Sequence, residues 1–191
     1  LDEVSASLNA MKYYQYNEDG ETALTLAIQQ NNEKMVRHLV KGAVINLKNR
    51  NGETPLTLAL KKKNRSIIQL VIKRAKAGLK NDEGIAPLML AMELNDLKLV
   101  QTLIEKGADV NRKSNGITPI AKATEMNNVR LVALLVRNGA DPSQANDDGD
   151  IPLYIAVRSG YTVISGILLH KSEQAGIDAN WQTDMGETLL N

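Results

Sequence analysis

The sequence predicts an all-α solenoid of stacked helix–turn–helix units that are joined by hairpin-like loops. The first observation is a turn glycine that recurs in steps of 32, 32, 32, 33 and 37 residues. The second is a pair of short apolar runs after the glycine, and the third is a proline that opens the first run in four copies. A fixed period in this range is typical of a repeat array. The recurring glycines are Gly20, Gly52, Gly84, Gly116, Gly149 and Gly186.

The clearest copy, residues 81–111, shows the elements of one unit in order. A polar turn at 81–84 leads into a first helix over 87–92, and a break at 95–96 separates it from a second helix over 97–104. The unit closes on a loop that ends at Asn111. Pro87 fits the first helical turn, where its missing backbone N–H costs nothing.

The break between the two helices is predicted to have a left-handed backbone. Asparagine or glycine stands there in four of the five copies, and both residues tolerate the conformation that commonly ends a helix. A lysine stands there in the second copy, where we expect the same backbone to be strained. The five residues are Asn31, Lys63, Asn95, Asn127 and Gly160.

These recurring residues resemble the ankyrin repeat, whose core reads Thr-Pro-Leu-His-x-Ala and which closes on Gly-Ala-Asp-x-Asn. Thr54-Pro55-Leu56 matches the opening, and Gly-Ala-Asp-Val-Asn at 107–111 matches the close. The resemblance covers residues 17–191 and implies an ankyrin-repeat solenoid. The family's histidine usually makes hydrogen bonds between neighbouring loops, and it is absent from every copy. The residues in its place are Thr25, Thr57, Met89, Ala121 and Tyr154.

The copies predict a single domain of five approximate repeats, at 17–46, 47–79, 80–111, 112–144 and 145–180. Residues 1–16 are predicted to hold the end of a preceding repeat, because Val4 and Leu8 lie four apart, as on one face of a helix. A capping helix unrelated to the repeats is the alternative. Residues 181–191 begin a sixth repeat. Because half a repeat cannot bury its apolar face alone, we expect the natural protein to continue past Asn191.

Composition excludes several classes of function. The formal net charge is +1, so nothing attracts the chain as a whole to nucleic acid or membrane. The absence of cysteine excludes disulfides, thiolate catalysis and Cys-based zinc sites. No apolar run is long enough to span a bilayer, and the N-terminal residues show no signal-peptide pattern. We expect a cytoplasmic location, in a bacterial or host cell, and a monomer in isolation.

No residue pattern indicates catalysis, a cofactor or a metal site. His38 and His170 lie 132 residues apart at different positions in their repeats, so they are expected to be structural or solvent-facing. Asp147, Asp148 and Asp150 lack the alternating ligands and the distant glutamate of a calcium loop, and they fit a hairpin tip. Phosphate-loop and Gly-x-Ser-x-Gly motifs are missing. We therefore expect no enzymatic activity and no cofactor.

The resemblance implies that a protein or peptide partner binds a concave face, which is made of loop tips and the exposed sides of the first helices. On that alignment the partner-facing residues are apolar in the third and fourth repeats and charged on either side, which is typical of an interface. Core packing of Leu94 and Met126 is the alternative. The predicted partner-binding residues are Arg50, Lys61, Lys62, Ile85, Leu94, Ile117, Met126, Asp148 and Arg158, and the alignment also points to Glu21 and Glu53.

The basic run at 61–63, with Lys48, Arg50 and Arg65, could bind an acidic protein segment, a phosphoinositide or RNA. Such runs are usually a solvated face, and no aromatic residues are interleaved for base stacking. Nucleic acid is therefore not an expected partner. We expect an interaction scaffold. The alternative is the targeting part of a larger enzyme, for example a bacterial effector or a kinase, whose catalytic domain lies outside these residues.

Overall fold

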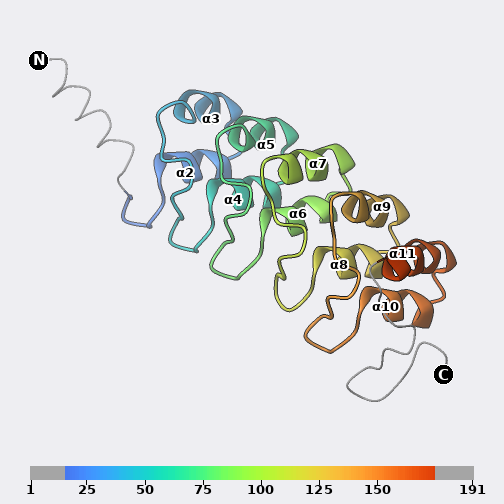
Figure 1. The fold of residues 1–191 in the computed structure, drawn as a ribbon. Coiled ribbons are helices and arrows are strands. Elements are labelled where there is room, and N and C mark those ends of the chain that lie inside the picture. The colour runs from blue at the N-terminus through green and yellow to red at the C-terminus, as the bar shows by residue number, and fades with distance from the viewer. Residues whose placement is uncertain (1–15, 175–191) are drawn as a thin grey trace, which may run out of the picture. The chain divides into compact units, whose positions relative to one another are not determined.

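The computed structural model describes residues 16–174. All but the last residue of the predicted partial repeat 1–16, the end of the predicted fifth repeat at 175–180 and the predicted partial repeat 181–191 lie outside this range. Ten α-helices and no strand occur within it, which confirms the predicted all-α repeat fold. The helices, which are labelled in Figure 1, form two compact units that divide after Leu94. None of the described helices is both long and apolar enough to cross a bilayer.

The N-terminal unit has two layers of helices. One layer holds the first helices of successive repeats, α2 (Ala23–Gln29), α4 (Pro55–Lys61) and α6 (Pro87–Glu93), and each contacts the next. The other layer holds the second helices α3 (Glu33–Leu39) and α5 (Arg65–Ile72), which contact one another and the first helix of their own repeat.

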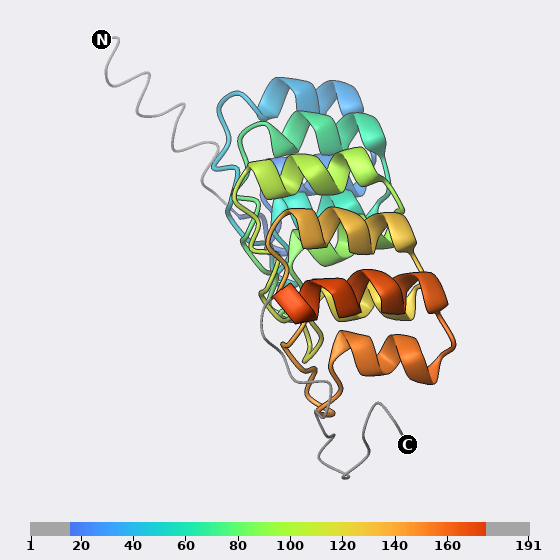
Figure 2. The same cartoon turned by 45° about the vertical axis from the view of Figure 1, so that its right-hand side comes forward.

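The C-terminal unit repeats this arrangement. Its first helices are α8 (Pro119–Glu125) and α10 (Pro152–Arg158), which contact each other. Its second helices are α7 (Leu97–Glu105), α9 (Val129–Arg137) and α11 (Thr162–Gln174), which form one layer in Figure 2. Within that layer α9 contacts both α7 and α11.

The core of both units lies between the two layers. The alanine in the middle of each first helix is at most 3% exposed, so the helices can approach closely at this position. Branched residues of the second helices fill the space opposite, and Leu103 and Leu135 are completely buried. Small residues of the first helices and branched residues of the second helices therefore form the core. The alanines are Ala27, Ala59, Ala91, Ala123 and Ala156.

Local signals start and end the helices as expected. Proline stands in the first turn of α4, α6, α8 and α10, and the five residues at the predicted break have φ between 49° and 72°. Asn32 and Asn64 then cap the following helices, because each side-chain oxygen accepts a hydrogen bond from the backbone N–H three residues later.

The hairpins are joined to one another without the family's histidine. In the N-terminal unit the backbone N–H of Asp82 donates to the carbonyl oxygen of Gly52 at 3.1 Å. The Asn49 side chain donates to Glu21 at 2.9 Å, and Asn81 donates to Glu53 at 3.1 Å. Side-chain amides and buried carboxylates therefore supply the loop-to-loop hydrogen bonds. Thr25 and Thr57, which replace the histidine, instead complete capping boxes with the preceding threonines.

Candidate partner-binding surface

The residue after each turn glycine faces the residue eight positions later, at the end of the first helix. Gln29 Nε2 donates to Glu21 Oε1 at 2.6 Å, and Lys61 Nζ forms an ion pair with Glu53. In the fifth repeat Arg158 lies 3.2 Å from Asp150 Oδ2. Three repeats thus connect the hairpin to the helix end with a polar contact, in which the hairpin supplies the acid.

The third and fourth repeats lack this polar contact. The hairpin position is Ile85 or Ile117, and the residue eight positions later is Glu93 or Glu125. The acid has therefore moved to the helix end, and an apolar side chain takes its place in the hairpin. Glu93 is exposed and makes no ion pair with any described residue, whereas Glu125 lies 4.0 Å from Lys122.

In the N-terminal unit this change accompanies a hollow of about 300 Å³. Leu60 and Leu90 are buried beneath it, and Ile85 is half-buried at its side. Exposed charged side chains lie around this apolar surface, an arrangement that suits a single apolar side chain of a ligand. The lining residues are Leu60, Lys61, Lys63, Ile85, Leu90, Glu93 and Leu94.

Lys61 is held by acids of its own chain. Besides Glu53, its ammonium contacts Glu83 Oε2 at 2.9 Å. The hydrogen bond to Glu53 raises the pKa of Lys61 above 10.5, and the hydrogen bond from Lys61 lowers the pKa of Glu83 below 4.5. Lys48 is likewise 2.5 Å from Asp82. Lys48 and Lys61 are therefore largely neutralised by neighbouring carboxylates.

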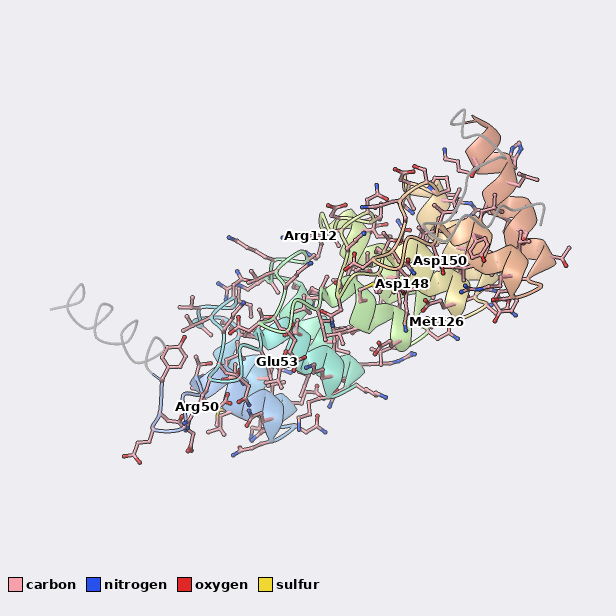
Figure 3. The ribbon with its side chains drawn as sticks, turned by 90° about the horizontal axis from the view of Figure 1, so that it is seen from below. Arg50, Glu53, Arg112, Met126, Asp148 and Asp150 are labelled. Carbon is pink, nitrogen blue, oxygen red and sulfur yellow. The ribbon has the colours of Figure 1, made fainter. Side chains whose placement is uncertain are left out.

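The structure places the nine predicted partner-binding residues as follows. Five charged residues are exposed, and four apolar residues are half-buried, so the apolar centre is only partly open to solvent. Figure 3 labels Arg50 in the N-terminal unit and Met126 and Asp148 in the C-terminal unit. The exposed residues are Arg50, Lys61, Lys62, Asp148 and Arg158, and the half-buried residues are Ile85, Leu94, Ile117 and Met126.

Two further positions from the alignment prove wrong, and several residues were missed. Glu21 and Glu53 are only 7% and 6% exposed, because each bonds an asparagine of the next hairpin, so neither faces a partner. The structure brings Lys61, Ile85 and Leu94 together around the hollow, but sequence reasoning missed Leu60, Leu90 and Glu93. A comparison of residues eight positions apart across the repeats would have identified Glu93.

The residues considered as metal ligands do not form a metal site among the described residues. Asp147 Oδ1 is 2.9 Å from Lys113, and Asp150 pairs with Arg158. His38 and His170 are both exposed. Among residues 16–174, no three His, Asp or Glu side chains are grouped so that they could hold a metal ion.

Lys63 adopts the predicted left-handed backbone, with φ of 58°. A side chain in this region costs roughly 1 kcal/mol. Lys63→Gly is therefore expected to raise the free energy of unfolding in urea by about 0.5–1 kcal/mol, since relief of strain outweighs the added flexibility of the unfolded chain. Lys63→Asn is the control, because it removes the charge and keeps a residue that tolerates this backbone. If both variants were less stable than the parent, backbone strain would not dominate at this position.

Comparisons with known proteins agree with this geometry. The model of the family described as "Ankyrin repeats (3 copies)" matches residues 4–80, 41–114, 63–146 and 88–183. Among solved structures, the chain is similar to the ankyrin repeat domain of Bcl-3, described as a unique member of the IkappaB protein family. The TM-score is 0.78 at 25% identity, and the match covers 99% of this chain and 85% of that chain. A search of curated proteins finds no match.

Proposed function

Since this chain belongs to the ankyrin-repeat family, whose repeats are generally protein–protein interaction modules, we propose that it binds a partner protein through its hairpins and first helices. In the N-terminal unit the hollow beside Ile85 and Leu94 is the anchor site. The observation that carries the proposal is the loss of the hairpin-to-helix ion pair in the third repeat, next to this hollow. An apolar partner side chain that enters it leaves water and packs against Leu60 and Leu90.

The charges around the hollow favour an acidic partner segment. Lys63 lines the hollow and Lys62 precedes it in the chain, and both are exposed and make no ion pair with any described residue. Among the described residues, Glu93 is the one acidic residue that lines the hollow, and it would repel an acidic partner. A strained residue that persists beside a binding site is consistent with a functional role for Lys63. The proposed ligand is a segment with one apolar anchor residue that is flanked by Asp or Glu.

A paired substitution tests the anchor site. Ile85→Glu with Glu93→Lys gives the third repeat the same pair that Glu53 and Lys61 form in the second repeat, so the fold is expected to tolerate it. Peptides are selected from a random library displayed on phage, with the parent chain as target. We expect enriched sequences to combine an apolar residue with acidic neighbours, and to bind the double variant at least about tenfold more weakly, a change of about 1.4 kcal/mol.

Gln69→Ala, on the exposed face of α5, is the control and is expected to leave peptide affinity unchanged. Circular dichroism and urea unfolding check that each variant is folded. If no sequence were enriched on the parent chain, the proposed function would be overturned. Peptides that bind the double variant as tightly as the parent would overturn the anchor site.

A further inference from the structure

The second helices of the C-terminal unit form another hollow, and all of its described lining residues belong to these helices. It has a volume of about 680 Å³ and lies between α9 and α11, which contact each other and run side by side in Figures 1 and 2. We call this hollow the α9–α11 groove. Its lining residues are Val136, Arg137, Val163, Gly166, Ile167, His170 and Lys171.

At Val163 the chain departs from its own repeat pattern. The side chain is 63% exposed, although it is aliphatic. The same position of every earlier second helix is polar or charged, as expected for a residue that faces solvent. An apolar residue at this one copy therefore indicates contact with something other than water. The earlier residues are Lys34, Ser66, Lys98 and Arg130.

Gly166 is a second departure on the same face of α11. Glycine inside a helix is destabilising relative to alanine. Its backbone has no positive φ, and a Cβ built there would meet no atom within 4 Å, so neither conformation nor packing within the described residues requires glycine. The missing side chain of Gly166 widens the groove and lets the backbone of another helix approach closely. The equivalent residues are Arg37, Gln69, Gln101 and Ala133.

The sides of the groove are basic. Arg137 and Lys171 line it and make no ion pair with any described residue. The sequence has no Asp or Glu over 129–137 or 162–172, and Glu173 stands in the last turn of α11. A smaller hollow of about 260 Å³ between α7 and α9 shares Arg137, so positive charge and apolar surface extend over the same layer of helices.

We propose that the α9–α11 groove binds an acidic amphipathic helix of a partner protein. Val163, Gly166, Ile167 and His170 are spaced as one stripe along a helix, and a groove between two helices can accept the apolar ridge of another helix. Acidic residues beside that ridge meet Arg137 and Lys171. A hollow fits a protruding ridge of a protein better than a flat lipid surface, and this favours a protein helix over an anionic membrane.

The test uses the full 191-residue chain and a variant that converts α11 to the pattern of α9. Val163→Arg with Gly166→Ala installs the residues found at Arg130 and Ala133. Because alanine replaces a helical glycine without a clash, we expect the variant to fold and its thermal midpoint to rise. A loss of binding then cannot result from unfolding. Gly166→Ala alone separates the effect of the methyl group from that of the arginine.

The probe is a library of helical peptides that are randomised on one face. On the parent chain we expect enrichment of helices with an apolar stripe and flanking Asp or Glu. Their affinity is expected to fall at least about tenfold in the Val163→Arg, Gly166→Ala variant and in Arg137→Glu. Affinity is expected to be unchanged in the Ile85→Glu, Glu93→Lys variant, which alters the other surface.

Three results would overturn this proposal. In the first, no helix is enriched on the parent chain. In the second, an enriched helix binds the converted variant as tightly as it binds the parent. In the third, no helix is enriched, but the chain binds phosphatidylserine vesicles and Arg137→Glu abolishes this binding. The last result would identify a lipid-binding surface instead. Because the two surfaces share no residue, each of these outcomes leaves the proposed function at Ile85 and Leu94 intact.

Discussion

Leu103→Ala is expected to lower the free energy of unfolding by about 2–5 kcal/mol. Leu103 lies in α7 and is completely buried, with no exposed side-chain area. Truncation removes apolar contacts and leaves a cavity that the surrounding helices fill only in part. The measurement is urea unfolding followed by circular dichroism.

The matched control is Lys98→Ala on the same helix, which is exposed and is expected to change stability by less than about 0.5 kcal/mol. Because repeats are stabilised by their nearest neighbours, amides next to the third repeat should also lose protection from hydrogen exchange in the Leu103 variant. A change as small as that of the control would contradict the burial of Leu103.

Gly52→Ala is expected to destabilise the chain by about 2–4 kcal/mol, for two reasons that add. The backbone at Gly52 has φ of 71°, where any side chain is strained. An added Cβ would also overlap the side chain of Asp82 in the next hairpin. The backbone N–H of Asp82 donates a hydrogen bond to the carbonyl oxygen of Gly52. The variant therefore disturbs both its own turn and the contact between neighbouring hairpins.

Gly107→Ala separates these two causes. Gly107 has φ of 85°, but an added Cβ would meet no atom within 4 Å, so only the backbone strain remains and a cost of about 1–2 kcal/mol is expected. Urea unfolding of both variants gives the comparison. Equal losses would show that contact with Asp82 contributes nothing to the effect at Gly52.

The two proposed binding surfaces are marked by the same kind of signal. Ile85 with Glu93 stands where the first, second and fifth repeats form a polar contact between hairpin and helix. Val163 stands where every earlier second helix has a polar or charged residue. In a repeat array each copy serves as a reference for the others, because equivalent positions share one backbone environment. A departure that exposes apolar surface without improving packing therefore indicates contact with a partner.

The sequence by itself determined the fold of this protein and the local backbone of each repeat. The period, Pro87 in the first helical turn and the left-handed break at Lys63 were all predicted and are confirmed. These features depend on residues close together in the chain, where steric limits on φ and ψ and the presence of a backbone N–H decide the outcome.

Only the tertiary structure decided which side chains are open to a partner. Lys61 was predicted to be a partner-binding residue of a basic run, and nothing in the sequence indicated that Glu53 of its own hairpin and Glu83 of the next one contact it. Glu53 is buried because Asn81 of the next repeat donates to it. Ion pairs and hollows are formed by atoms from neighbouring repeats, about 20–30 residues apart in the chain. A pattern within one repeat does not record those distances, so the hollow above Leu60 and the α9–α11 groove became visible only in three dimensions.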